Sequence, residues 1–434
     1  MKIKSFLIVL LIFCLLFFFI SNISAVNTID DYAYVMAIGI DSLDNNRINL
    51  SLQIAIASSD GSDSSSSQSL SSIVNTIDCN TIDCGINQIN NTLNKKLNLS
   101  YCKAIVFSKD KAKLGIGNEV SDLINDLELR PSCNLIVCDN TAKEYLENSN
   151  PLLEKLSSKY YENEKFSEKN TSFTKATTLI DFYNNMFSSK TQPYAILSRI
   201  SNKKDNQDNK KNKNTKNADS MENTASDSSD SSDSNDNNDK SDGNKSNSEE
   251  SIKKQKETPH INSYGIAVFN NDMYVGDLSS QESIIHLILL NEFKHTIVSI
   301  PSPFESNKYI SLDISKANAT NHVDFFNNTT FISCNLKLKA KLLSNSKDIN
   351  YMDKENIKKI EESCNNYFSD LTNSYFNKTS KNFNSDITHF GEIASRKFMT
   401  NEDWIKVNWL DNYKNCIFNV TVNTNIESSF IVLN

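Results

Sequence analysis

The chain has 434 residues, a length that predicts two or three domains. Only 38% of the residues are hydrophobic, a low share for a globular protein, so part of the chain is expected to lie outside any folded core. Lys plus Arg total 45 against 53 for Asp plus Glu, a net charge of -8 that lacks the basic footprint of a nucleic-acid-binding protein. We therefore expect no nucleic-acid partner.

The first 25 residues have the pattern of an export signal. Lys2 and Lys4 precede an apolar stretch from Phe6 to Ile20, and small and polar residues follow. This stretch is short for a membrane span of about 20 residues, and Ala25 offers a cleavage site with a small side chain. Residues 1–25 are therefore either a cleaved signal peptide or an uncleaved membrane anchor. In both cases the two lysines direct the rest of the chain outward.

Nine cysteines are present, one of them within the apolar amino-terminal stretch. The other eight could form disulfides in an exported chain, but the sequence favours free thiols. Cys133 and Cys138 are five positions apart around a predicted strand, which places their side chains on opposite faces. Cys334 and Cys364 fall on the apolar phase of a strand and of a helix, where a thiol behaves as a small hydrophobic group. No Cys-x-x-Cys pair occurs, so no zinc site is predicted.

Two polar segments divide the chain. Residues 201–258 hold only four apolar side chains and are expected to form a disordered linker, because they cannot bury enough surface to offset their ordering entropy. A shorter polar insertion at 58–72 is expected to be an exposed loop. The predicted folded parts are an amino-terminal α/β domain at 26–200 and a carboxyl-terminal α+β domain at 259–434. Two prolines near residue 300 suggest that the second domain consists of two modules.

Hydrophobic periodicity predicts strands and helices in the amino-terminal half. Apolar and polar residues alternate at 48–56, and with the apolar run at 32–40 and a turn at Asn45 and Asn46 they predict a hairpin. The later elements expected here are a helix over 86–97, a strand at 104–107, a helix at 119–129, a strand at 134–138, and helices at 141–161 and 173–187. This alternation predicts a sheet with helices packed on it.

A second set of elements is predicted after the linker. Strands at 264–269 and 273–276 flank a turn and predict another hairpin. Ser279 and Glu282 form a capping box that opens a helix through Leu290. The remaining elements expected are a long alternating strand at 330–342, a helix of about thirty residues from Asp353, and a final strand at 416–426. The fold class predicted from the whole pattern is α+β, with two to three modules of mixed sheets and packed helices joined by the linker.

No catalytic or metal-binding pattern stands out. The five histidines lack the spacing of a zinc site, and the pair Gly115 and Gly117 lacks the third glycine of a nucleotide-binding loop. A Gly-x-Ser-x-Gly nucleophile elbow is absent. Adjacent carboxylates such as Glu361 and Glu362 are expected to lie on a solvated face. We therefore predict no enzyme activity, no metal and no cofactor.

Lys337, Lys339 and Lys341 form a row on the outer face of the strand predicted at 330–342. Such a row could meet an anionic lipid surface. It could also be a polar sheet face that discourages edge-to-edge pairing, which is the more common meaning. The sequence favours the second interpretation.

Five stretches of the chain, in the same order, resemble one known family. They are DDYAYVMAIGID at 30–41, LSYCKAIVFSKDKAKLGI at 99–116 with ELRPSCNLIVCDNTAKEYLE at 128–147, TTLIDFYNNMFSSKTQPYAIL at 177–197, INSYGIAVFNNDMYVGDLSSQES at 261–283, and DITHFGEIASRKF at 386–398 followed by two tryptophans. In this order they resemble the Ger(x)C family, the C subunits of spore-germination nutrient receptors. The residues that carry the family signature are Asp31, Gly39, Asp41, Arg130, Pro131, Gly265, Phe269, Gly276, Phe390, Gly391, Trp404 and Trp409.

The resemblance implies a non-catalytic subunit on the outer face of the spore inner membrane. It also implies that the chain works with the A and B membrane subunits of a germinant receptor to sense nutrients. Two other hypotheses stay open from the residues alone. One is an exported stand-alone protein that binds a wall polymer or a small ligand, and the other is an exported hydrolase whose carboxylates converge only in three dimensions.

The chain departs from the family at its membrane anchor. Members of the family are typically lipoproteins with a modified cysteine shortly before the acidic pair, and the corresponding position near Ile23 has no cysteine. Cys14 does not replace it, because Phe13 precedes it where a small residue is needed. We therefore expect no lipid modification. The anchor is expected to be either the uncleaved apolar segment or contacts with partner subunits.

Overall fold

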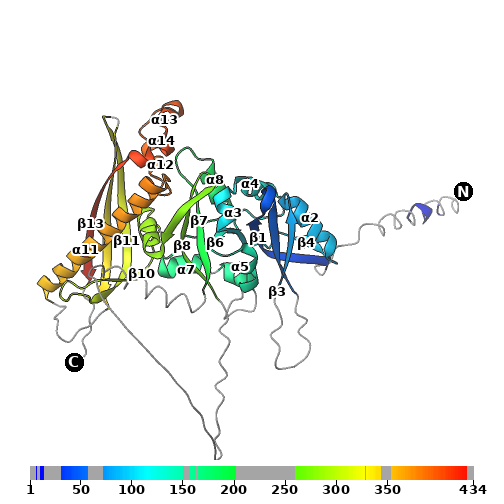
Figure 1. Ribbon diagram of the computed structural model, residues 1–434, viewed down its shortest axis with the longest axis horizontal. Coiled ribbons are helices and arrows are strands. Elements are labelled where there is room, and N and C mark those ends of the chain that lie inside the picture. The colour runs from blue at the N-terminus through cyan, green and yellow to red at the C-terminus, as the bar shows by residue number, and fades with distance from the viewer. Residues whose placement is uncertain are drawn as a thin grey trace, which may run out of the picture.

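The computed structural model of the protein contains two modules that lie side by side, each a sheet covered by helices (Figure 1). It describes residues 6, 10–13, 31–56, 72–149, 157–162, 164–201, 260–327, 329–343 and 353–427. Most of the expected signal or anchor, of the linker and of the Ser-rich loop lies outside these residues. Among the described helices, none is both long and apolar enough to cross a membrane. The predicted α+β class with mixed sheets and packed helices is confirmed.

The first module is built on a nine-stranded sheet. Its strands are β1 (Tyr32–Ser42), β2 (Ile48–Ala55), β3 (Ser72–Cys79), β4 (Lys96–Asn98), β5 (Ala104–Ser108), β6 (Asn134–Cys138), β7 (Tyr194–Ser201), β8 (His260–Asn270) and β9 (Met273–Ser279). They lie in the order β3-β2-β1-β5-β6-β7-β8-β9, with β4 beside the start of β1. The central strands β1, β5, β6 and β7 are parallel, and the strands on both flanks are antiparallel.

The β1–β2 hairpin forms where the alternation predicts it. Its turn contains Asn45 and Asn46, whose φ angles of 60° and 59° are left-handed, a conformation that Asn tolerates better than most residues. The central strands are buried on both faces. On β5, for example, Phe107 belongs to one core cluster and Val106 to another. This explains why the short central strands are continuous apolar runs.

The hairpin that follows residues 201–258 completes the first sheet. β8 pairs antiparallel with β7, from Tyr194 opposite Val268 to Ser201 opposite His260. The predicted linker therefore connects two neighbouring strands of a single sheet. Gly265, on β8, lies in this shared sheet and not in the second one.

Helices cover both faces of the first sheet. They are α2 (Ile82–Thr92), α3 (Lys109–Leu114), α4 (Gly117–Asn125), α5 (Ala142–Asn148), α6 (Ser157–Glu162), α7 (Glu164–Thr171) and α8 (Leu179–Met186). α2, α3, α4 and α8 contribute buried residues to one core cluster, and α5 and α6 contribute to the other. The sheet with packed helices that the alternation predicts is thus present.

The second module is built on a four-stranded sheet of order β10-β11-β12-β13. Its strands are β10 (Thr296–Pro301), β11 (Tyr309–Phe326), β12 (Thr329–Leu342) and β13 (Ile417–Glu427). β12 alternates as predicted, with Ile332, Leu336 and Ala340 buried. β13 lies parallel to β12, while the other pairs are antiparallel.

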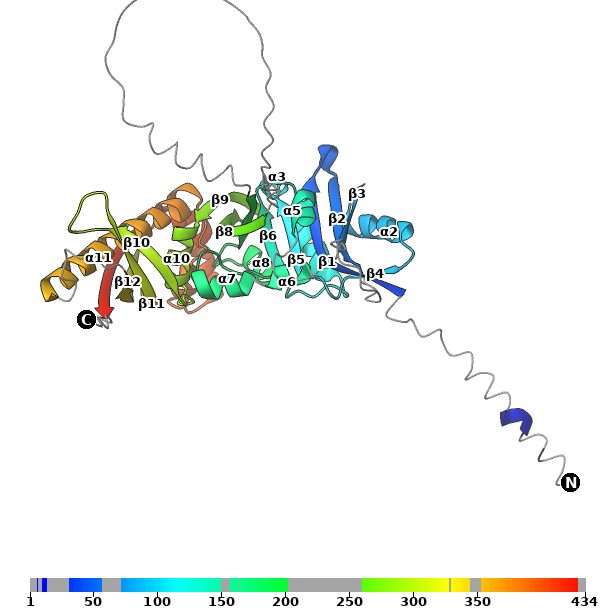
Figure 2. The same cartoon turned by 90° about the horizontal axis from the view of Figure 1, so that it is seen from below.

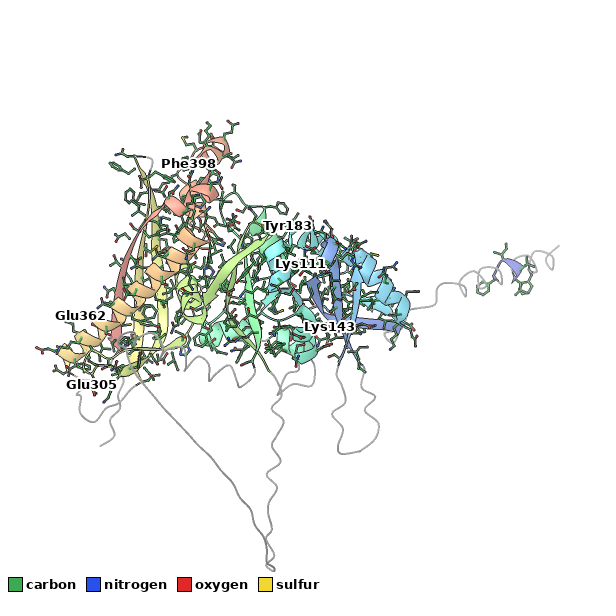
Figure 3. The ribbon with its side chains drawn as sticks, in the orientation of Figure 1. Lys111, Lys143, Tyr183, Glu305, Glu362 and Phe398 are labelled. Atoms are coloured by element: carbon green, nitrogen blue, oxygen red, sulfur yellow. The ribbon has the colours of Figure 1, made fainter. Side chains whose placement is uncertain are left out.

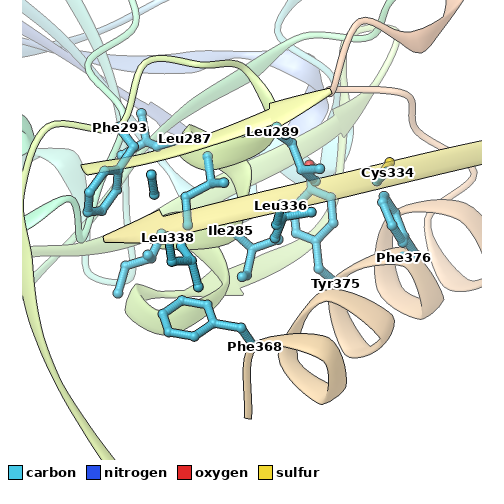
Figure 4. Packing of buried hydrophobic residues seen from close by; sticks show 14 of the residues in the cluster. Ile285, Leu287, Leu289, Phe293, Cys334, Leu336, Leu338, Phe368, Tyr375 and Phe376 are labelled. Carbon is cyan, nitrogen blue, oxygen red and sulfur yellow. The ribbon is translucent and has the colours of Figure 1, made fainter. Parts of the chain in front are cut away.

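Helices cover one face of this second sheet. They are α10 (Ser280–Leu289), α11 (Lys354–Phe376), the π-helical turn η3 (Asn377–Asn382), α12 (Phe390–Ser395), α13 (Asn401–Val407), α14 (Trp409–Asn412) and the short η4 (Tyr413–Asn415). Figure 4 shows Leu336 and Leu338 of β12 facing Phe368 and Tyr375 of α11. The same core cluster continues onto Ile266 of β8, so the two modules share buried surface.

Several helix boundaries differ from the predicted ones. The helix expected over 119–129 ends at Asn125, and the one expected over 141–161 ends at Asn148. The helix expected over 173–187 begins at Leu179, because a capping box between Thr178 and Asp181 sets its first turn. The elements that were not predicted are β3, β4, β7, β10, β11, α3, α7, α12, α13 and α14.

Candidate functional site

The signature residues at the end of β1 hold helix α5. The buried carboxylate of Asp41 accepts hydrogen bonds from the N–H groups of Ala142 at 2.7 Å and Lys143 at 3.1 Å, the first two residues of this helix. A carboxylate there satisfies free N–H groups and meets the positive end of the helix dipole. Gly39 lets α5 come close, since a Cβ at this position would lie 3.0 Å from Leu146 Cδ1. The Gly-Ile-Asp segment at the end of β1 is therefore a helix-docking point.

The signature residues of the β8–β9 hairpin are sites of close packing. A Cβ on Gly265 would lie 2.2 Å from a carbonyl oxygen of β9, and one on Gly276 would lie 2.3 Å from the ring of Phe383. Phe269 is fully buried, and its carbonyl oxygen accepts a hydrogen bond from Ser385 Oγ at 2.6 Å. The hairpin of the first sheet thus receives the segment that follows α11.

That segment leads into a buried carboxylate, Asp386. Its Oδ2 accepts hydrogen bonds from the Gly391 N–H at 2.7 Å and from the indole Nε1–H of Trp409 at 2.8 Å. Its Oδ1 accepts from the N–H groups of Thr388 and Phe390, each at 3.2 Å. Burial raises the pKa of Asp386, and these hydrogen bonds only partly oppose that effect. Three of the four carboxyl-terminal signature residues therefore contact this one side chain.

The same region contacts the first module. The Trp404 indole N–H donates to Ser189 Oγ at 3.2 Å, and the Gln192 N–H donates to the carbonyl oxygen of Asp386 at 2.9 Å. The rings of Trp404 and Trp409 lie 5.9 Å apart between their centroids. We call this group the junction site; its members are Ser189, Gln192, Asp386, Phe390, Gly391, Trp404 and Trp409.

The remaining signature residues lie elsewhere. Arg130 and Pro131 are exposed in the turn before β6, where the Pro131 carbonyl oxygen accepts a hydrogen bond from the Ile180 N–H of α8 at 3.1 Å. Asp31 is exposed immediately before β1. Nine of the twelve signature residues therefore serve helix docking, hairpin packing or the junction site, and Asp31, Arg130 and Pro131 lie on the surface outside these groups.

A second polar cluster lies where the parallel strands end. Lys109, which follows β5, contacts Asp139 at 3.0 Å and Asp277 at 2.6 Å. Tyr264 donates a hydrogen bond to Asp139, and Tyr274 donates one to Asp277. Burial lowers the pKa of Lys109, but hydrogen bonds and charge from the two carboxylates outweigh this and leave it raised. Lys109 follows β5, Asp139 follows β6 and Asp277 lies on β9. Their ion pairs therefore join the β8–β9 hairpin to the central strands.

The glycine pair after α3 does not form a phosphate-binding loop. Asp272, in the turn between β8 and β9, accepts a hydrogen bond from the Gly117 N–H at 3.2 Å, and its own carbonyl oxygen accepts one from Ile116 at 3.1 Å. Gly115 has a φ of 97°, a conformation that glycine adopts without strain. The start of α4 therefore already holds a carboxylate of the same chain.

The buried histidine of the second module is enclosed in the core and takes part in hydrogen bonding there. His286 of α10 is fully buried, and its Nδ1 lies 2.9 Å from the hydroxyl of Tyr375, which in turn contacts Thr388 Oγ1 at 2.6 Å. Burial lowers the pKa of His286 well below its usual value, so the ring is neutral at physiological pH. A neutral, enclosed imidazole next to a tyrosine has no access to a substrate.

The cysteines of the described part of the chain are free thiols. Burial raises the pKa of Cys133 and Cys334 to about 12, so these thiols stay protonated and weakly nucleophilic at neutral pH. Among the described residues, no group of three or more His, Cys, Asp or Glu side chains is placed to hold a metal ion.

Two surface hollows lie at opposite ends of the second module. One of about 680 Å³ follows α11 beside Glu362 and Pro301. The other, of about 730 Å³, lies between the β11–β12 turn and α13, with Phe326, Phe398 and Trp409 in its wall. Figure 3 shows Glu362 and Phe398 near these two ends. The second hollow adjoins the junction site through Trp409.

Sequence reasoning missed the residue at the centre of the junction site. Asp386 opens the stretch DITHFGEIASRKF, in which Phe390 and Gly391 were singled out and the aspartate was not. This aspartate stands four residues before Phe390 and five before Gly391. Such a spacing allows the carboxylate to accept hydrogen bonds from the main-chain N–H groups of the following turn. Glu164, a buried carboxyl on α7, was also missed because it stands in a polar segment without periodicity.

Comparisons with known proteins support one family. Residues 26–202 match a family model described as "Spore germination protein N-terminal domain", and residues 264–429 match one described as "Spore germination B3/GerAC like, C-terminal". Among solved structures, the chain is similar to "Crystal Structure of the GerBC protein", with 12% sequence identity and a TM-score of 0.46 over 90% of this chain and 96% of that chain. No curated protein matches the chain.

Proposed function

Because the chain belongs to the GerAC family of spore germination proteins, we propose that it is the non-catalytic C subunit of a nutrient germinant receptor. The observation that carries the proposal is the order and extent of the two family matches, which together span both folded modules. The proposed place of work is the outer face of the spore inner membrane, with the A and B membrane subunits of the receptor as partners.

The site chemistry supports a scaffolding role. The signature residues are used to dock α5, to pack the β8–β9 hairpin and to build the junction site around Asp386. The buried His286 and the buried thiols are held in unreactive protonation states. A subunit built in this way presents a fixed surface to its partners and leaves ligand recognition and ion release to the assembled receptor.

Deletion of the gene, followed by germination assays, tests the proposal. Mutant spores should germinate slowly or not at all with at least one nutrient from a panel of amino acids and sugars. Germination by a stimulus that bypasses nutrient receptors should be unchanged, and the wild-type gene supplied in trans should restore the response. Normal germination of the deletion strain with every nutrient would argue for the alternative of a stand-alone wall-polymer or small-ligand binding protein.

A further inference from the structure

The outer face of the second sheet is uncovered. α11 lies along one side of β10–β13, and none of the helices that the structure describes covers the other side (Figure 2). On β12 the outward residues alternate with buried ones such as Leu336 and Leu338. An exposed sheet face of this length is available to a partner surface.

Four lysines gather on this outer face. Lys337, Lys339 and Lys341 follow each other at every second position of β12, and Lys316 lies directly opposite Lys339 on β11. Like charges opposite each other destabilise a sheet, so this arrangement has a cost that an anionic partner would remove. The other outward residues beside them on the neighbouring strands are mainly amides and hydroxyls.

The balance of charge on the face is positive, with four lysines against the three carboxylates Asp313, Asp324 and Glu427. Glu427 pairs with Lys339 at 3.1 Å, and Asp313, opposite Lys341, is held by His295 at 2.8 Å. Lys316, Lys337 and Lys341 form no ion pair with any residue that the structure describes. This concentration of free cations stands out in a chain of net charge -8.

Toward the β11–β12 turn the same face carries exposed apolar side chains around Asp324, which lies opposite Phe331 and pairs with Lys397. Phe331 and Ile417 are outward neighbours on β12 and β13, and they are 37% and 49% exposed. Phe326, on the outward side at the end of β11, is 67% exposed. From Phe331 to Lys337 is six residues along one strand, or about 20 Å. Lysines suited to anionic lipid headgroups and aromatic side chains suited to the bilayer interface thus lie on one face of the sheet.

We propose that this face of the β10–β13 sheet docks onto a bilayer that contains anionic lipids. A soluble polyanion would use the lysines but leave the apolar end unsatisfied, whereas a bilayer surface engages both. A second copy of the chain is disfavoured, because its lysines would face these lysines. The inference rests on the proposed function for the nearness of a membrane, and it gives the module a fixed orientation on that membrane.

The test uses the full chain in vesicles and a reporter on the face itself. Phe331→Trp adds an indole at an exposed position, while the two native tryptophans are each only 3% exposed. Brominated phosphatidylglycerol mixed with phosphatidylcholine should quench the added fluorescence, measured against the parent chain without the reporter. Brominated phosphatidylcholine alone should quench it at least fivefold less, and high salt should reduce the quenching in the anionic vesicles.

Charge-reversal variants make the test specific. Lys337→Glu, Lys339→Glu and Lys341→Glu together should abolish the quenching, and the same three changes to Gln should weaken it. The matched control reverses Lys143, Lys354 and Lys358, which are exposed elsewhere, and should leave it unchanged. Equal quenching in both lipids, or no effect of the three face lysines, overturns the proposal, as does a change in oligomeric state without quenching. If the quenching is absent but the deletion strain still shows the expected germination defect, the docking inference fails and the proposed function stands.

Discussion

Asp386 shows how one buried charge can organise a junction. Burying a carboxylate costs several kcal/mol unless hydrogen bonds replace its water. Three main-chain N–H groups and the Trp409 indole supply these bonds, and each donor would itself be unsatisfied without the carboxylate. The interaction is therefore mutual, and neither side can be removed alone without a large penalty.

Replacement of Asp386 by Ala should lower the free energy of unfolding by about 3–5 kcal/mol, because it leaves four buried donors without an acceptor. Urea unfolding followed by circular dichroism measures the change. The matched control is Asp370→Ala on the exposed side of α11, which should change stability by less than about 0.5 kcal/mol. A loss as small as that of the control would show that Asp386 does not hold the junction.

Glu164 gives the protein a pH-dependent stability. It is buried on α7, and burial raises its pKa to about 7, although Ser263 donates a hydrogen bond to it at 2.6 Å. The unfolded chain has the ordinary value of 4.5, so the folded state binds the proton more tightly. The stability that the protonated Glu164 side chain contributes to the folded state is fully present below pH 4.5 and is lost as pH rises through about 7.

Replacement of Glu164 by Gln should remove this component. Relative to the wild type, the variant should gain about 3 kcal/mol of stability between pH 4.5 and pH 8, as follows from the difference between the two pKa values. Urea midpoints at a series of pH values measure it. Glu362→Gln, on the exposed side of α11, serves as the control and should keep the wild-type pH profile. Parallel profiles for wild type and the Glu164 variant would contradict the prediction.

Among the elements, one repeated pentapeptide shows the limit of local sequence. NTIDC occurs at 75–79 and again at 80–84. The first copy lies in strand β3, and the second begins helix α2, with Thr81 as its N-cap. The difference comes from tertiary contacts: the first copy pairs with β2, and a Cβ on the following Gly85 would lie 2.6 Å from Cys79 Sγ. No propensity argument on five residues could separate the two.

The longest strand of the protein escaped prediction for a similar reason. On β11 the buried apolar residues are Ile310, Leu312 and Ile314, and then Ala317, Ala319 and Val323. A bulge between Ile314 and Lys316 shifts the alternation by one residue, which breaks the period of two. β12, which has no such shift, was predicted almost to its ends. Regular hairpins and capped helices were therefore readable, whereas β11, whose alternation changes phase partway along the strand, was not.

The candidate site was readable only in part, because its chemistry depends on long-range contacts. The Phe-Gly turn and the two tryptophans are visible in the sequence as a resemblance. The contact of Gln192 with Asp386, nearly two hundred residues later, is not. Pairing of β7 with β8 across the predicted linker was hidden for the same reason.

The substitution Gly391→Ala should displace helix α12 from the junction site. A Cβ there would lie 2.1 Å from the carbonyl oxygen of Lys190, and this backbone cannot move without opening the junction. The two tryptophans of the protein are both in the junction site and nearly buried, so their emission should shift to the red. Ser395→Ala on the same helix is the control. An unshifted emission maximum in the Gly391 variant would mean that the turn accommodates the methyl group.

At the scale of the whole molecule, polar contacts join the two modules in addition to their shared core cluster. One is the junction site. A second is an ion pair at 2.7 Å between Lys175, before α8, and Glu292, after α10, beside a hydrogen bond from Ser172 to the carbonyl oxygen of His295. The first sheet also joins the two halves of the chain, since β8 and β9 belong to it although they follow residues 201–258. The chain should therefore unfold as one cooperative unit.

This arrangement predicts the fate of a nicked chain. Residues 201–258 contain almost no apolar side chains, so limited proteolysis should cut there first. The two products should still elute together in native buffer, because β7 pairs with β8 over its full length from Tyr194 to Ser201 and the modules share a core cluster. They should separate only in denaturant, which size-exclusion chromatography with and without urea measures.

A deletion provides the matched control for the nicked chain. Ser201 and His260 are register partners, so their Cα atoms are about 5 Å apart and a short Gly-Ser turn in place of 202–259 can connect them. This variant should resist the protease and keep the thermal midpoint of the wild type, because nothing in the sheet pairing requires the segment. Separation of the nicked products in native buffer would show instead that β8 is held by chain connectivity and that the linker marks a true boundary between independently folded halves.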